Sequence, residues 1–66
     1  MTYRINTYIP GWPKSNKIVE YRGSLLGVKR RATGTLFWGA HTFISNESGV
    51  IARRSCDAHG NLSKWN

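Results

Sequence analysis

The sequence predicts an all-β fold: a small, strongly bent antiparallel sheet or barrel of four to five strands, in a single layer or packed against a second copy as a dimer. β-Branched and aromatic residues, which favour strands, dominate the 66 residues, and no window rich in Ala, Leu, Glu and Lys repeats at helical spacing. Turn residues separate the candidate strands at intervals of about 8 to 12 residues, as in small barrels and sandwiches. We therefore expect residues 1–66 to form one small, basic β domain.

Residues 2–9 form the first predicted strand because apolar and polar residues alternate along them. One face of this strand carries Tyr3, Ile5, Thr7 and Ile9, and the other carries Arg4, Asn6 and Tyr8. Residues 10–16 contain two prolines and one glycine, which remove a ladder donor or favour turns, so we expect a loop there. Trp12 in this loop is expected either to fold back as a lid or to stand exposed as a contact.

Residues 17–31 mix apolar and polar side chains, and Gly23 and Gly27 interrupt them. Glycine inside a strand pattern marks a bulge or a sharp bend, so we expect one strongly coiled strand or two short strands that meet at Gly23. A helix is conceivable only over residues 24–31, and Gly27 disfavours it because glycine has a low helix propensity. Residues 32–34 are predicted to form the turn that follows.

Residues 35–45 form the clearest predicted strand. One of its faces carries Leu36, Trp38, Ala40, Thr42 and Ile44, and the other carries Phe37, Gly39, His41, Phe43 and Ser45. Gly49 suits the left-handed position of a short hairpin loop, so residues 50–56 are expected to return as a paired strand. The tail from residue 57 combines turn residues with Leu62 and Trp65, which predicts a short strand or an apolar clip onto the body.

Ten Lys and Arg residues against three Asp and Glu residues give a formal net charge of +7 and a pI near 10.4. Such an excess favours polyanionic partners, namely DNA, RNA, nucleotides or an acidic protein surface, although it also serves solubility. No run of roughly 18 apolar residues and no signal-peptide pattern is present, so we expect a cytoplasmic protein with no membrane partner. The small size of a Met-initiated chain favours an accessory protein of a bacterium, phage or plasmid.

A chain of this length buries only about 60% of its unfolded surface, so its core is marginal without further support. The single cysteine, Cys56, excludes an internal disulfide. Three Trp, three Tyr and two Phe residues are also more aromatic surface than one small core readily hides. We therefore expect the protein to form a homo-oligomer.

Clustered cations and interleaved aromatic residues are the strongest functional signal in the sequence. Single-stranded nucleic acid is bound by a basic groove that follows its backbone and by aromatic rings on which its bases stack. The predicted nucleic-acid or anion site consists of Lys29, Arg30, Arg31, Phe37, His41, Phe43, Arg53 and Arg54. We expect the four arginines to form one surface with Phe37 or Phe43, which favours single-stranded DNA or RNA over a specific duplex sequence. In the alternative interpretation, residues 35–45 are buried on both faces and their rings belong to the core.

Two further functions fit the composition. Tyr, Trp and Arg are enriched at protein interfaces, so the chain is alternatively an inhibitor or accessory protein that binds an acidic protein or sequesters a phosphorylated nucleotide. A small RNA-cleaving enzyme is the third candidate, because histidines, carboxylates and arginines can supply its acid, base and cations. The residues for that chemistry are His41, His59, Glu20 and Glu47. Since the sequence does not specify their mutual geometry, we expect a binding protein without catalytic residues.

The sequence has no motif for a metal or a nucleotide cofactor. Cys56 and His59 have a C-x-x-H spacing, but structural zinc requires four ligands that normally include several cysteines. The sequence also lacks G-x-x-x-x-G-K-[ST] and G-x-G-x-x-G, the loops that cradle phosphates in nucleotide-binding enzymes. We therefore expect neither a cofactor nor a metal.

Overall fold

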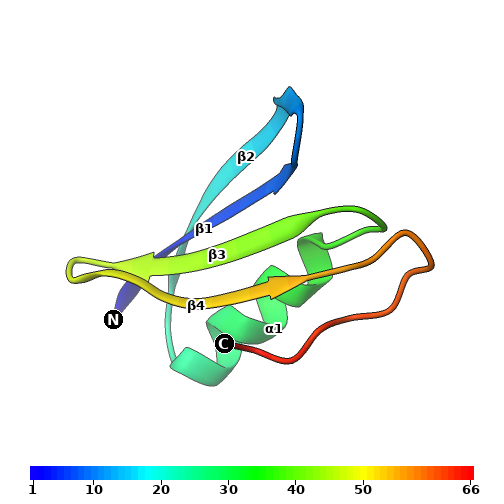
Figure 1. The fold of residues 1–66 in the computed structure, drawn as a ribbon. Helices are drawn as coiled ribbons and strands as arrows, with labels where there is room; N and C mark the ends of the chain where they lie inside the picture. Colours follow the sequence, from blue (N-terminus) through cyan, green and yellow to red (C-terminus); the bar gives the residue numbers. More distant parts are fainter.

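A single antiparallel sheet of four strands carries one helix on one of its faces in the computed structural model, which describes residues 1–66 (Figure 1). The elements along the chain are β1 (Thr2–Ile9), β2 (Trp12–Arg22), α1 (Leu25–Thr35), β3 (His41–Asn46) and β4 (Gly49–Ser55). The strand order β2-β1-β3-β4 makes β1 and β3 central and places β2 and β4 at the edges. The predicted small antiparallel sheet is confirmed, and it stays open rather than closing into a barrel.

The core lies between the sheet and the helix. Alternate residues of the central strands face α1, so that Ile5 of β1 lies opposite Ile44 of β3 and both are fully buried. The buried cluster consists of Tyr3, Ile5, Val28, Ala32, Ile44 and Ala52, and Tyr21 and Trp65 pack against it while partly exposed. The alternation predicted for residues 2–9 is confirmed, since Tyr3, Ile5 and Thr7 are all buried.

Helix α1 corrects the prediction for residues 25–35, which were expected to continue a strand, turn at residues 32–34 and begin the next strand. Ser24 caps the helix, because its hydroxyl oxygen accepts a hydrogen bond from the Gly27 amide at 3.0 Å. Val28 and Ala32 lie one turn apart and are completely buried against the sheet. Tertiary burial of this narrow apolar stripe outweighs the poor helix propensity of the glycines and threonines around it.

The strand predicted over residues 35–45 and the loop predicted over residues 10–16 also differ from the structure. The strand expected over residues 35–45 begins only at His41, because residues 36–40 form the connection from α1. Within β3 the predicted faces hold: Thr42 and Ile44 are buried, and His41 and Phe43 lie on the other side. The loop expected over residues 10–16 is only a turn at Pro10 and Gly11, and β2 begins at Trp12.

The tail beyond β4 confirms the predicted apolar clip for Trp65, whereas Leu62 is 45% exposed and forms an isolated bridge with Cys56. The tail runs back along the outer edge of β4, where the Ser63 amide donates to the Ser55 carbonyl at 2.9 Å. The Trp65 ring packs against the core, with Lys29 Nζ 5.8 Å and Arg54 Cζ 5.5 Å from its centroid. The tail therefore protects the β4 edge, while the edge of β2 stays free (Figure 1).

Helix α1, the one helix of the chain, is too short at 11 residues to cross a lipid bilayer.

Two glycines of α1 allow a direct test of this packing. A methyl group at Gly27 would overlap the hydroxyl of Tyr21, whereas one at Gly34 meets nothing within 4 Å. We expect Gly27→Ala to lower the free energy of unfolding by about 1 to 3 kcal/mol through overpacking. Gly34→Ala is expected to raise it by up to about 1 kcal/mol, because alanine is the better helix former. Denaturant unfolding followed by circular dichroism measures both values.

The double variant Tyr21→Phe, Gly27→Ala is the control, because phenylalanine lacks the hydroxyl that the methyl group would meet. The cost of Gly27→Ala should be smaller in the Tyr21→Phe background than in the wild type. An equal cost in both backgrounds would contradict the assigned contact.

Candidate nucleic-acid interface

The face of the sheet opposite α1 is not covered by another element of the chain. Arg4, Asn6 and Tyr8 of β1 lie on this open face, and β3 contributes His41, Phe43 and Ser45. β4 adds Arg53 and Ser55, which pair with Phe43 and His41 respectively. Burial of the other face against α1 thus leaves the polar and aromatic residues of β1 and β3 at the surface.

Three aromatic side chains form a row across the two central strands. The Tyr8 ring stacks on His41, with centroids 5.7 Å apart and planes 23° apart, and on Phe43, with centroids 5.6 Å apart and planes 18° apart. The Arg53 guanidinium carbon lies 5.8 Å from the Phe43 centroid, within cation–π range. We call Tyr8, His41 and Phe43 the aromatic row. All three are half-buried, so their rings are held in place and still meet solvent.

The structure brings together His41, Phe43 and Arg53 of the predicted site residues. Lys29, Arg30 and Arg31 are separated from them, because they lie on α1 at the opposite face of the sheet. These three cations were expected in a turn, and the expectation of one surface joining all four arginines to a phenylalanine is wrong. The helix that interrupts the predicted strands carries them to the far side.

The last two predicted residues, Phe37 and Arg54, occupy other surroundings. Phe37 lies in the connection from α1 to β3 and is 45% exposed. Arg54 points to the helix side, where its Nε donates to the Ser63 carbonyl at 2.7 Å and its Nη1 donates to Thr33 Oγ1 at 3.0 Å. These bonds fix Arg54 at the junction of β4, the tail and α1.

Tyr8 completes the aromatic row but is missing from the predicted site. It occupies the polar face of the first strand, which is the signal that it points away from the core. What the sequence does not show is that β1 pairs with β3, with Tyr8 directly opposite His41. That pairing joins segments far apart in the chain.

Two hollows flank the aromatic row. The hairpin hollow, about 390 Å³, lies at the β1–β2 turn and is lined by Asn6, Tyr8, Trp12 and Asn16 together with Ile9 and the turn itself. The arginine hollow, about 300 Å³, lies beside β4 and is lined by His41, Phe43, Arg53, Arg54, Ser55, Ser63 and Asn66. One hollow is therefore uncharged and the other cationic, with the aromatic row between them.

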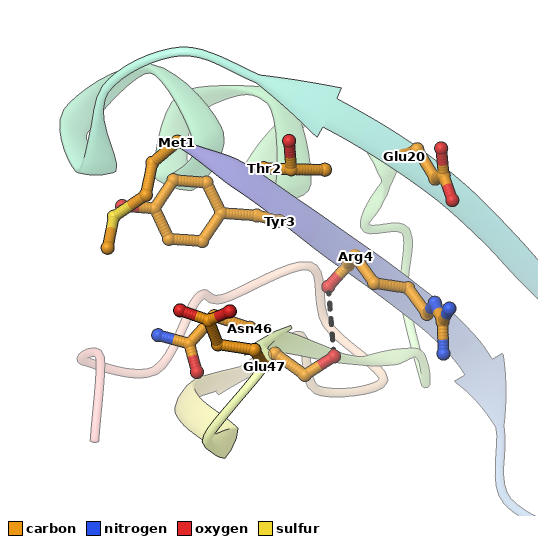
Figure 2. A pocket seen from close by; sticks show the side chains of 8 residues that line it. Met1, Thr2, Tyr3, Arg4, Glu20, Asn46 and Glu47 are labelled. Atoms are coloured by element: carbon orange, nitrogen blue, oxygen red, sulfur yellow. Dashed lines mark hydrogen bonds between the residues drawn. The ribbon is translucent and has the colours of Figure 1, made fainter.

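Two of the three carboxylates of the chain lie in a third hollow, of about 480 Å³, at the other end of the sheet. Figure 2 shows Glu20 and Glu47 around this acidic hollow with Met1, Tyr3 and Arg4. Among the residues that line it, the Ser45 hydroxyl donates to the Arg4 carbonyl at 3.5 Å, which is the dashed line in Figure 2. The carboxylates thus stand where β1 begins and β3 ends, away from the aromatic row at the opposite ends of these strands.

The third carboxylate, Asp57, organises the tail. Its Oδ1 accepts hydrogen bonds from the backbone amides of His59 at 2.8 Å and Asn61 at 2.9 Å. The hydrogen bond from the Asn61 backbone amide, supported by the one from His59, lowers the pKa of Asp57 below its ordinary value of 3.8. Cys56 is buried while His59 is exposed, so the C-x-x-H pair does not converge on one site.

Comparison of the chain with protein-family models, curated proteins and solved structures finds no match.

The lowered pKa of Asp57 predicts the pH dependence of the tail. Because the folded pKa lies below 3.8, the stabilisation from Asp57 is complete at neutral pH and is lost as the pH falls through the folded pKa. The amide resonances of His59 and Asn61, followed by NMR during acidification, should titrate together with a midpoint below 3.8. Asp57→Asn should abolish this shared titration. A midpoint above 3.8 in the wild type would show that the hydrogen bonds do not lower the pKa of Asp57.

Proposed function

We propose that the protein binds single-stranded nucleic acid on the open face of its sheet, as a binding protein without catalytic activity. The observation that carries this proposal is the aromatic row on the central strands with Arg53 over one of its rings. Base stacking on aromatic side chains contributes roughly 1 to 3 kcal/mol per base and tolerates any base, because every base has a π face.

The arrangement favours unpaired over paired bases. In a duplex the base faces are already stacked on each other, so rings fixed on a sheet can reach them only where strands are separated. The cation beside the row is suited to phosphates, because Arg53 is exposed and its guanidinium group lies next to the Phe43 ring. The net charge of +7 adds long-range attraction for any polyanion.

The cations of α1 have a lesser role in this proposal. Arg30 and Arg31 are exposed on the side of the sheet that does not carry the aromatic row. They raise the overall attraction for a polyanion, which salt screens over a Debye length of about 8 to 10 Å. They do not contact bases that lie on the row.

Loss of the rings should weaken binding directly. Tyr8→Leu and Phe43→Leu keep an apolar side chain on the sheet and remove the stacking surface. Each is expected to weaken binding of a labelled single-stranded oligonucleotide by roughly 5- to 150-fold, the equivalent of one lost stack. Fluorescence anisotropy measures the dissociation constants, and thermal unfolding verifies that each variant is folded. Wild-type affinity in both variants would exclude the row as the binding surface.

Arg53→Glu and Arg30→Glu form a matched pair for the location of the site, since each changes the net charge equally. Arg53→Glu should weaken binding more and reduce the dependence of log K on log salt by about 0.7 per lost phosphate contact. Equal effects would indicate attraction without a localised site. The recovered oligonucleotide should be intact after incubation; cleavage that His41→Ala abolishes would favour the RNA-cleaving alternative.

A further inference from the structure

We infer that the hairpin hollow receives one unstacked base of the bound strand and that the arginine hollow holds a phosphate of the same strand. This inference rests on the proposed function and names how the ligand lies: across the strands of the sheet, from the β1–β2 turn to β4. The geometry points to it through the contrasting chemistry of the two hollows.

The hairpin hollow has the composition of a base pocket. Its lining has no charged side chain and combines the rings of Tyr8 and Trp12 with the amides of Asn6 and Asn16. Its volume of about 390 Å³ lies within the range of small-ligand pockets, about 300 to 1,000 Å³. Aromatic faces with a few amides are the groups that bind the face and the edge of a splayed base.

Trp12 is the exposed wall of this hollow. Trp12 is 68% exposed, although tryptophan has the largest of the apolar side chains. The register of β1 and β2 shifts between Thr7 and Ile9, a bulge that re-aims the chain before the turn. Ser15 fixes this end, because its Oγ accepts from the Ile9 amide at 2.8 Å and donates to the Trp12 carbonyl at 2.6 Å. The backbone that carries Trp12 is therefore held in place before any ligand binds.

Asn6, which lines the hollow, carries a buried hydrogen-bonding atom without a partner. Its Oδ1 is the one buried side-chain nitrogen or oxygen atom of the chain without a hydrogen-bond partner. A buried acceptor without a donor destabilises the fold, because it has lost its hydrogen bonds to water and gained none in return. Rotation of the amide can present this oxygen, or the amino group, to the edge of a base and remove that cost.

The arginine hollow has the opposite character. Arg53 provides the guanidinium group of this hollow, while Arg54 lines it but directs its own guanidinium group to Thr33 and Ser63. Guanidinium groups match the geometry of phosphate oxygens. From β2 to β4 the sheet spans three inter-strand spacings, about 14 Å, so a few nucleotides connect the two hollows over the aromatic row.

Trp12→Ala tests the base pocket, with Trp38→Ala as its matched control. Both tryptophans are 68% exposed, so neither substitution disturbs the core, and Trp38 lines neither hollow. The probes are a labelled oligothymidylate of roughly 12 nucleotides and an abasic strand of the same length, a size suited to small single-strand binders. Trp12→Ala should weaken binding of the oligothymidylate by roughly 5- to 150-fold and leave binding of the abasic strand unchanged. Trp38→Ala should bind both probes as the wild type does.

Two further variants separate the hollows. Asn6→Ala should reduce the differences in affinity among homopolymers of the four bases, and Arg53→Gln should weaken binding of both probes alike. If Trp12→Ala binds the oligothymidylate as the wild type does, while Phe43→Leu does not, the base pocket is overturned and the proposed function stands. If the wild type binds no single strand, or binds duplex equally well, the proposed function itself is overturned.

Discussion

The packing of α1 against the two central strands is the interaction on which the rest of the structure depends. Val28 and Ala32 are fully buried in one cluster with Ile5 and Ile44. Because this contact occupies one face of the sheet, and the chain has no second helix, the other face stays open. Alternate residues of β1 and β3 are thereby divided into a core set and a surface set, and the aromatic row belongs to the second.

The resulting core is small, and side chains at its edge from β2 and the tail complete it. Helix α1 buries only two side chains, and Gly27 lets it lie next to Tyr21 of β2. Trp65 closes the core from the tail, with cations of α1 and β4 at its ring. A chain of this size has little apolar surface to bury, so a tail that packs back on the body supplies part of what a larger domain obtains from additional elements.

The same contact distributes the charges. The sheet separates Arg30 and Arg31 of α1 from Arg53 of β4, whereas Arg54 of β4 lies on the helix side, where it shares the Trp65 ring with Lys29. Glu20 and Glu47 stand at the other end of the sheet. A ligand strand on the open face therefore meets rings in the middle, the guanidinium group of Arg53 beside β4 and uncharged groups at the β1–β2 turn, and no Asp or Glu residue lines these hollows.

The sequence by itself determined the antiparallel β class, the alternation in residues 2–9 and the shared face of His41 and Phe43, because a strand places side chains by a local period of two. Only the tertiary structure decided that residues 25–35 form a helix, since burial of Val28 and Ala32 outweighs their neighbours' low propensity. That helix moved Arg30 and Arg31 away from the rings. The addition of Tyr8 to the row depended on the pairing of β1 with β3, which joins distant segments and has no local signal in either of them.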